Sequence, residues 1–149
     1  MKRPATEGVA PTVKVGNRQR RVRVDTAALQ KLAGRAFHRI LTVHRRGETD
    51  LRKLNHVHVW LISDRSMSIL HRRFLNIDGP TDVVTFQHGE IFISVETARR
   101  NARLFRNSLP NELRLYVIHG LLHLDGFRDD TRAQGRRMRA EQKRIAQLN

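Results

Sequence analysis

The chain has 149 residues, 39% of them hydrophobic, and no cysteine, which suits one soluble domain and excludes disulfides and thiolate metal sites. Lysine and arginine outnumber aspartate and glutamate by 29 to 14, and the formal net charge of +15 predicts a polyanionic partner, RNA or DNA first. No apolar run is long enough to span a membrane and no signal peptide is evident, so we expect a cytoplasmic protein. Only 5% of the residues are aromatic, which argues against a platform of stacking rings as the main mode of binding nucleic acid.

The first third of the chain predicts a tail, a strand and a long helix. Residues 1–11 are rich in proline and poor in apolar side chains, and we expect them to be a disordered basic tail. Residues 12–15 alternate as in a strand, and Gly16-Asn17 predicts a turn after it. Residues 18–24 either pair back as a hairpin or cross extended to the next helix. Asp25 is a suitable N-cap for that helix, in which apolar residues recur at helical spacing.

The middle of the chain predicts three more strands and two helices. Residues 56–62 alternate His56, His58 and Trp60 with apolar residues, which indicates a strand with one half-exposed face. A short helix should follow from Ser63 through Phe74, and the strands at 83–86 and 91–93 are close enough in sequence to pair antiparallel. The apolar residues of the next helix that we expect to face inward are Val95, Ala98, Ala102 and Phe105.

The apolar segment 113–124 predicts a buried helix, with Pro110 breaking the chain before it and Asn111 as its cap. This helix carries His119 and His123 one turn apart, and therefore on one face. Two imidazoles in a buried helix need partners, because each unsatisfied buried polar group costs about 1–3 kcal/mol. The pair is either two ligands of a metal ion or two ordinary core histidines.

The residues after this helix favour the metal. Gly126 can end the helix in a left-handed conformation, after which the chain can fold back and bring Asp129 to the same ion. Two imidazoles and one carboxylate leave a fourth tetrahedral position open, as in catalytic zinc sites. A zinc protease of the H-E-x-x-H kind has its general base directly after the first histidine, where this chain has Gly120, so we do not expect a protease.

A basic terminal helix over residues 132–147 completes the pattern, with Met138, Ile145 and Leu148 on its apolar side. The order of elements predicts an α+β fold over residues 12–149, a single domain in which a small mixed sheet of about four strands packs with helices. The predicted metal site lies on a buried helix and the loop that follows it.

Two separate motifs resemble the YbeY family of bacterial ribosomal RNA maturation factors. The first is P-T-D-V-V-T-F at residues 80–86, and the second is H-G-L-L-H-L-D-G-F at residues 119–127. Shorter matches support them, and the resemblance covers residues 12–148. The supporting stretches are Asn17-Arg18-Gln19, Ile62-Ser63-Asp64, Gly89-Glu90-Ile91-Phe92-Ile93-Ser94, and Met138 with Glu141.

The resemblance implies an α+β domain that holds one zinc ion and cleaves single-stranded RNA as a metal-dependent endoribonuclease. It also implies a role in maturation of the 3′ end of 16S ribosomal RNA and in quality control of the small ribosomal subunit. Ribosomal RNA and the small subunit would then be the partners, without a membrane. The cleavage position, the metal used in the cell and the oligomeric state stay open.

The chain departs from the family pattern at two positions. The third ligand of the family is usually histidine, and the ungapped match here is Asp129, which can also bind zinc. A slip of one residue would make Asp130 the ligand instead. The arginine that precedes the family's first motif aligns with Leu75. Arg72 and Arg73 lie close enough in sequence to contact RNA in the same pocket, or else belong to a solvated helix surface.

The catalytic residues beyond the metal ligands stay unknown at this stage. Asp82, Asp125 and Asp130 are candidates for a general base, although each also fits a cap or a turn. Two other functions are consistent with the sequence. One is a non-catalytic RNA-binding ribosome assembly factor with a structural metal, in which Leu75 marks a lost activity. The other is a metal-dependent hydrolase with a substrate other than RNA.

Overall fold

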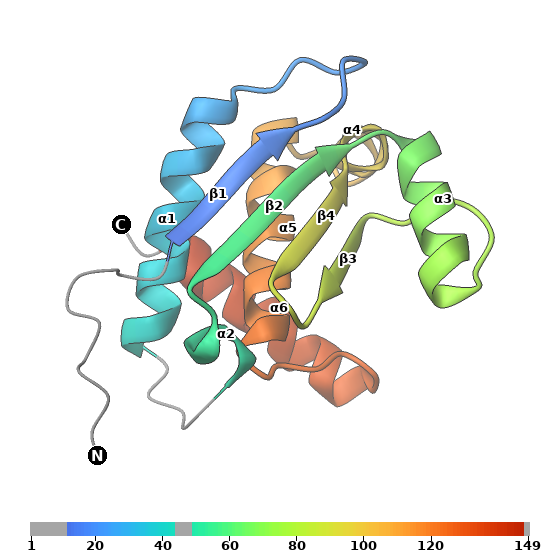
Figure 1. Cartoon of the computed structure of the whole chain (residues 1–149). Coiled ribbons are helices and arrows are strands. Elements are labelled where there is room, and N and C mark those ends of the chain that lie inside the picture. The colour runs from blue at the N-terminus through green and yellow to red at the C-terminus, as the bar shows by residue number, and fades with distance from the viewer. Residues whose placement is uncertain (1–11, 44–48, 148–149) are drawn as a thin grey trace.

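The computed structural model describes residues 12–43 and 49–147 (Figure 1). Its elements in chain order are β1 (Thr12–Asn17), α1 (Thr26–Val43), α2 (Asp50–Lys53), β2 (His56–Ile62), α3 (Asp64–Leu75), β3 (Val83–Phe86), β4 (Glu90–Ser94), α4 (Val95–Leu104), α5 (Leu109–Leu124) and α6 (Arg132–Gln147). The tail expected at residues 1–11 and the expected apolar contact of Leu148 lie outside the described residues. Within the described ranges, every helix is too short or too polar to cross a membrane.

The strands form one four-stranded mixed sheet in the order β1-β2-β4-β3. β1, β2 and β4 run parallel, and β3 pairs antiparallel with β4 at the edge. The helices α1 and α5 pack on one face of the sheet, behind the strands in Figure 1, while α3 packs against β4 beside the other face. The predicted α+β fold with a small mixed sheet is therefore confirmed.

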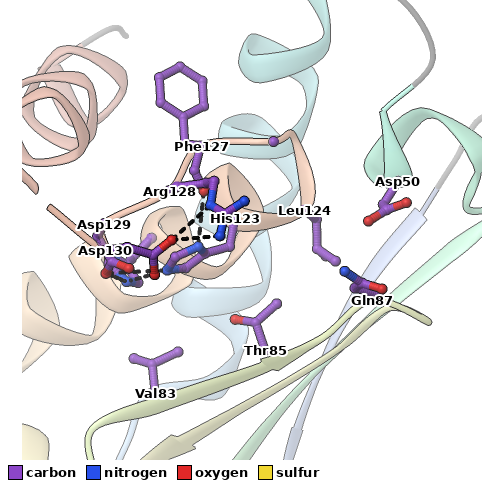
Figure 2. Close-up of a pocket in the computed structure, with 12 residues that line it drawn as sticks. Asp50, Val83, Thr85, Gln87, His123, Leu124, Phe127, Arg128, Asp129 and Asp130 are labelled. Atoms are coloured by element: carbon purple, nitrogen blue, oxygen red, sulfur yellow. Dashed lines mark hydrogen bonds and ion pairs between the residues drawn. The ribbon is translucent and has the colours of Figure 1, made fainter. Parts of the chain in front are cut away.

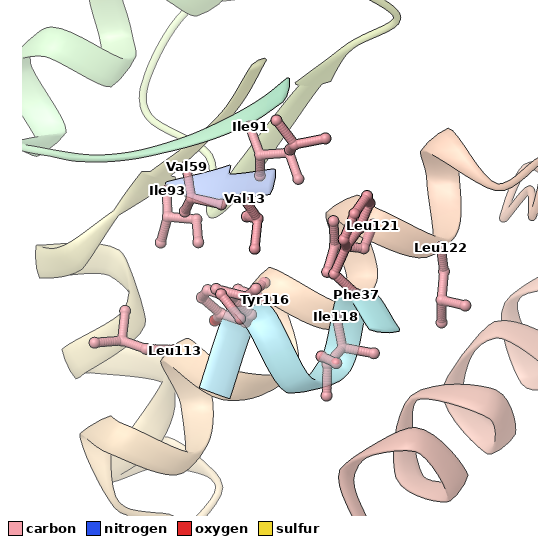
Figure 3. Packing of buried hydrophobic residues seen from close by; sticks show 14 of the residues in the cluster. Val13, Phe37, Val59, Ile91, Ile93, Leu113, Tyr116, Ile118, Leu121 and Leu122 are labelled. Carbon is pink, nitrogen blue, oxygen red and sulfur yellow. The ribbon is translucent and has the colours of Figure 1, made fainter. Parts of the chain in front are cut away.

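The helix-covered face of the sheet and the helices above it form the main core (Figure 3). Alternate strand residues point into it, and Val57, Val59, Ile91 and Ile93 are completely buried. α5 contacts α1, α4, α6 and two strands, so it is buried on nearly every side, as its apolar sequence predicts. A buried helix of this kind is held rigidly, and it can present side chains in fixed positions.

Gly120 explains how α5 comes so close to the sheet. A Cβ atom at this position would lie 2.7 Å from Cγ2 of Ile91 on β4, which is inside van der Waals contact. Any larger residue at this position requires the Ile91 side chain or α5 itself to shift. Gly120, which stands where a zinc protease has its general base, therefore also allows α5 to pack closely against β4.

Three details of the predicted elements are wrong. Gly16 and Asn17 continue β1 instead of forming a turn, whereas residues 18–24 cross to α1 without pairing as a strand, which is one of the two predicted alternatives. The N-cap of α5 is Ser108, whose hydroxyl accepts from the backbone N–H of Asn111, so Asn111 lies inside the first turn and Pro110 is tolerated there. Phe105 is 67% exposed, because α4 ends at Leu104 before another inward position is reached.

One helix has no counterpart in the prediction. The single turn α2 begins after Thr49, whose side chain accepts from the backbone N–H of Arg52. The same hydroxyl donates to Asp125 Oδ1 at the end of α5, at a distance of 3.0 Å. α2 therefore joins the start of β2 to the C-terminal end of α5, close to the predicted metal ligands.

Candidate metal centre

The structure brings His119, His123 and Asp129 together. The two Nε2 atoms lie 2.9 Å apart, and each lies 3.4 Å from Asp129 Oδ2. The histidines come from the last two turns of α5, and the aspartate comes from the loop before α6. Gly126, with φ of +93°, reverses the chain between them, as its position in the sequence predicts.

The other nitrogen of each ring is already used. His123 Nδ1 donates to the backbone oxygen of Phe127 at 3.0 Å, and His119 Nδ1 donates to Oε1 of Gln142 on α6 at 2.7 Å. A ring that donates from Nδ1 and is neutral has its lone pair on Nε2. Two rings held in this way present both Nε2 atoms to one point beside Asp129, which is how proteins orient histidine ligands of a metal.

Burial and the neighbouring His119 lower the pKa of the His123 imidazole, and they outweigh Asp129, which acts in the opposite direction. His123 is therefore neutral at pH 7. Its lone pair is available without competition from a proton, which is the protonation state that a metal ion requires.

The spacing of the three atoms fits a first-row metal ion. Zinc binds imidazole nitrogen and carboxylate oxygen at about 2.0–2.2 Å, which places neighbouring tetrahedral ligands about 3.3–3.6 Å apart. The two separations of 3.4 Å from Asp129 fall in this range, and the two Nε2 atoms, 2.9 Å apart, need to move apart by only a few tenths of an ångström. A cation at this point also removes the repulsion between two lone pairs. The residues present therefore fit one metal ion.

Asp129 and not Asp130 belongs to this cluster. The carboxylate of Asp130 accepts from both Nε and a terminal nitrogen of Arg128, at 2.8 and 2.7 Å. Its backbone N–H in turn donates to Gln134 Oε1 on α6. The arrangement agrees with the ungapped match of the sequence motif at Asp129.

The three side chains line a cavity of about 540 Å³ between the end of α5 and the edge strand β3 (Figure 2). The opposite wall is formed by Val83, Thr85 and Gln87, which alternate along β3 and its extension. The Thr85 hydroxyl is buried and, among the described residues, has no hydrogen-bond partner. Such an atom is costly unless a bound group satisfies it, so Thr85 marks where a polar ligand fits beside the metal ligands.

The candidate general bases occupy three different environments. Asp125 is completely buried at the end of α5 and accepts from Thr49. Asp82 Oδ1 accepts from the backbone N–H of Val83 at 2.8 Å and fixes the entry into β3. Asp130 lines the cavity but is paired with Arg128. Asp82 and Asp125 thus have structural contacts of the kind expected for a turn and a cap.

Arg72 and Arg73 do not line this cavity. Both are exposed near the end of α3, where Arg72 pairs with Asp78 and Arg73 lies beside the ring of Phe74. Leu75, which stands where the family has arginine, is 48% exposed on the same helix. Arg128 is the basic residue that the structure places in the cavity wall.

Several residues of the site escaped the sequence-based prediction, among them Gln142, Thr85 and Gln87. Gln142 lies 23 residues after His119 in the sequence, and only the packing of α6 against α5 brings the two side chains together. Thr85 lies inside a motif that resembles the family, and the alternation of β3 would have placed it on the same face as Val83. Gln87 has no recognisable signal.

With this geometry in view, comparisons with known proteins identify the family. A profile of the family described as Endoribonuclease YbeY matches residues 14–148. The chain belongs to the YbeY family. A relative from Cytophaga hutchinsonii, named Endoribonuclease YbeY, is 32% identical over 109 residues, which make up 68% of this chain and 74% of the relative. A relative of the same name from Thermotoga maritima is 41% identical over 78 residues, or 48% of this chain and 52% of that relative.

The fold agrees with this assignment. The solution structure of TM1509 from Thermotoga maritima matches with a TM-score of 0.61 and 27% sequence identity, and the match covers 90% of this chain and 86% of that protein. The resemblance to the YbeY family that the two motifs indicate is therefore confirmed. All three residues of the candidate metal centre lie within the part of the chain that the family profile matches.

Proposed function

We infer that this member of the YbeY family is a metal-dependent endoribonuclease specific for single-stranded RNA. We further assign to it the maturation of the 3′ end of 16S ribosomal RNA and quality control of the small ribosomal subunit, in the cytoplasm. The observation that carries the inference is the convergence of two imidazole lone pairs and the Asp129 carboxylate in one cavity, in a chain whose relatives are named endoribonucleases.

His119, His123 and Asp129 would hold one zinc ion in this cavity. When bound, the ion supplies a positive charge that polarises a phosphate oxygen and activates a water molecule. Gln142 and the backbone oxygen of Phe127 keep the two rings oriented by accepting their Nδ1 protons. These hydrogen bonds also make the imidazoles better ligands.

The walls of the cavity suit a phosphate group. The unpartnered hydroxyl of Thr85 can donate to a phosphate oxygen opposite the metal ligands. The guanidinium of Arg128 lies in the wall and keeps donors beyond those that it shares with Asp130. Asp130 and Asp50 are the acidic residues that line the cavity besides Asp129, and either can accept a proton from the attacking water.

Gly120 argues against peptide hydrolysis by the same metal centre. A zinc protease needs a glutamate directly after its first histidine. Even a Cβ atom at position 120 would collide with the side chain of Ile91, so a glutamate there would have to displace Ile91 or the helix.

The experiment that tests this function is RNA cleavage by the zinc-loaded protein. We expect cleavage of a single-stranded RNA, slower cleavage of the same sequence in a duplex, and loss of activity on treatment with a chelator. His119→Ala is the negative control. RNA affinity should fall steeply as salt increases, because each phosphate that the protein neutralises releases condensed counterions.

Two results would contradict the proposal in different ways. RNA binding without cleavage by the fully zinc-loaded protein would favour the non-catalytic assembly factor, the function that agrees with leucine in place of the family's arginine at position 75. If the protein does not bind RNA even at low salt, RNA is not the substrate, and the remaining function is that of a metal-dependent hydrolase with another substrate.

A further inference from the structure

The face of the sheet opposite α1 and α5 is turned toward the viewer in Figure 1. Alternation along the strands brings aromatic and basic side chains to this face. α3 covers one end of it, where Ile62, Met67 and Val84 form a small apolar cluster. Trp60, Phe86 and Phe92 pack against this cluster and are partly buried, and the other side chains on this face are partly or fully exposed. We call this face the open face, and its residues are Lys14, His56, His58, Trp60, Phe86, His88, Glu90 and Phe92.

Trp60 is held in place at the centre of the open face. Its ring lies over Gly16 of the neighbouring strand, where a Cβ atom would come within 2.3 Å of Trp60 Cζ3. Its Nε1 donates to Glu90 Oε2 at 3.0 Å. The ring of His58 is parallel to it, with 5.3 Å between centroids, and the guanidinium carbon of Arg18 lies 3.8 Å from its centroid. A ring fixed in this way loses little conformational entropy on binding a ligand.

A second group of rings lies on the edge strand β3. Phe86 is stacked with His88 at 5.6 Å between centroids, and it meets Phe74 of α3 edge to face at 5.4 Å. The sequence has an aromatic content of only 5%, yet the sheet order and α3 bring Trp60, Phe74, Phe86 and Phe92 to one side of the molecule. The average composition therefore conceals a local concentration of rings.

The charges around these rings suit a polyanion. Glu90 is the one acidic residue among the strand residues that point to this face, and its carboxylate already accepts from Trp60 and from His88 Nε2. Lys14 and Arg18 are exposed beside Trp60. The connection that begins with Arg18 continues with further exposed arginines, namely Arg20, Arg21 and Arg23. Flat rings between cations are the combination with which proteins bind unpaired bases and the phosphates that join them.

The open face also adjoins the candidate metal centre. Along β3 and its extension, Val83, Thr85 and Gln87 line the metal cavity, while Phe86 and His88 point to the open face. β3 is the edge strand, so a nucleic-acid strand can pass over it from one side of the sheet to the other. A duplex is too thick to follow this path and keeps its bases stacked on one another.

We propose that the open face is a binding surface for single-stranded RNA, on which bases flanking the cleavage position stack against Trp60 and Phe86. This assignment rests on the proposed function, since it extends the path of the same RNA strand. It supplies a physical basis for a preference for unpaired RNA, because only unpaired bases present a free ring to a protein side chain.

Trp60 is the only tryptophan in the chain, so its intrinsic fluorescence reports on this face alone. The probe is a single-stranded RNA of about 12 nucleotides, which is as long as the sites of comparable single-strand binders. The titration is carried out in the presence of a chelator, so that the metal-dependent cleavage proposed above does not consume the RNA. We expect this RNA to quench the fluorescence with the same dissociation constant as that measured by the anisotropy of labelled RNA. A duplex of the same sequence should neither quench as strongly nor bind as tightly.

Substitution separates stacking from general electrostatic attraction. Trp60→Leu and Phe86→Leu should each weaken RNA binding about 5- to 150-fold, the range that corresponds to 1–3 kcal/mol for one stacked base. Trp60→Phe keeps a ring and should retain most of the affinity. Phe105→Leu, which changes an exposed aromatic residue at the end of α4, is the matched control and should bind RNA as the unchanged protein does.

The outcomes distinguish this proposal from the function on which it rests. One result would overturn the open face as an RNA surface and leave the proposed function intact. In that result the anisotropy shows RNA binding, Trp60 fluorescence does not change, and Trp60→Leu binds RNA with wild-type affinity. Equal quenching of Trp60 fluorescence by the duplex would also overturn the open face as a surface for single-stranded RNA. So would a Trp60 fluorescence that changes when a protein partner binds and does not change when RNA binds. Failure to bind any RNA would overturn both. If Trp60→Leu does not fold, the quenching of the unchanged protein still decides.

Discussion

The two faces of the sheet are built in different ways. On the helix-covered face, a single buried helix and the loop after it supply all three candidate metal ligands. On the open face, one group of rings lies on β2 and the other on β3 and α3, and the order β1-β2-β4-β3 brings both groups to the same side of the sheet. The candidate metal ligands on the helix-covered face thus depend on spacing within one short segment, and the proposed RNA surface on the open face depends on the order of the strands.

This difference predicts that the two faces can be disabled separately. His119→Ala or His123→Ala should lower RNA cleavage by about 100-fold or more, because the metal loses one of three protein ligands. RNA affinity should change by less than about threefold, since stacking and phosphate contacts on the open face remain. Cleavage rates, anisotropy and the metal content of each purified variant measure both effects.

The open-face variants provide the reverse case. Trp60→Leu should weaken RNA affinity and leave zinc content at the wild-type value. If cleavage and affinity always fall together in both sets of variants, the two faces do not have separate roles.

A smaller effect is expected from the residue that orients His119. Gln142→Ala removes the acceptor of the Nδ1 proton and should lower zinc affinity about 10- to 100-fold. Lys143→Ala is the matched control, because Lys143 is the next residue of α6 and is exposed. Competition with a zinc-binding dye measures both. Equal zinc affinities for the two variants would mean that Gln142 does not support the metal ligand.

The packing that connects the two faces can be tested through the glycines. Gly120→Ala should reduce the free energy of unfolding by about 1–3 kcal/mol, because the added methyl group collides with Ile91 between α5 and the sheet. Gly34→Ala is the control on α1, where the new methyl group meets no atom within 4 Å and should stabilise the helix by about 0.5–1 kcal/mol. Urea denaturation measures both, and a Gly120→Ala protein as stable as the wild type would disprove the close approach.

The smallest expected effect is at Asp64, which joins α3 to β4 and α4 beside the open face. Burial raises the pKa of its carboxyl, but hydrogen bonds from Arg100, Ser94 and Thr97 outweigh burial and hold the pKa below its ordinary value. Because the folded-state pKa is depressed, the stabilisation is present above the unfolded pKa of about 3.9 and is lost as the pH falls through the folded-state value.

Asp64→Asn should therefore destabilise the protein by about 1 kcal/mol at pH 7, and by less in acid. Thermal unfolding of both proteins between neutral pH and about pH 2–3 measures the difference. A difference that does not depend on pH would show that the charge of Asp64 contributes nothing.

Much of the fold and the metal centre could be predicted because their signals are local. The spacing of His119 and His123, the left-handed Gly126 and the alternation of residues 56–62 all depend on neighbours in the sequence. Ser108 was missed as a cap because Asn111 is also a good capping residue, and Phe105 was misplaced because helical spacing does not reveal that α4 ends one residue earlier.

The remainder depends on contacts across the fold. Gln142 reaches His119 only through the packing of α6 on α5. Trp60 and Phe86 come to one face only because β4 inserts between β2 and β3 in the sheet. Neither arrangement has a signature in a short window of sequence. The low aromatic content of 5% argued against a platform of stacking rings, because composition does not show that the fold gathers several rings on the open face.

The central claim is that His119, His123 and Asp129 hold one metal ion. X-ray absorption at the zinc edge of the zinc-loaded protein tests it most directly, with Asp129→Ala for comparison. We predict one zinc ion per chain with two imidazole ligands and oxygen ligands at about 2.0–2.2 Å, and loss of one oxygen ligand or of the zinc itself in the variant. Zinc bound without imidazole, or a spectrum that Asp129→Ala leaves unchanged at full occupancy, would contradict the claim.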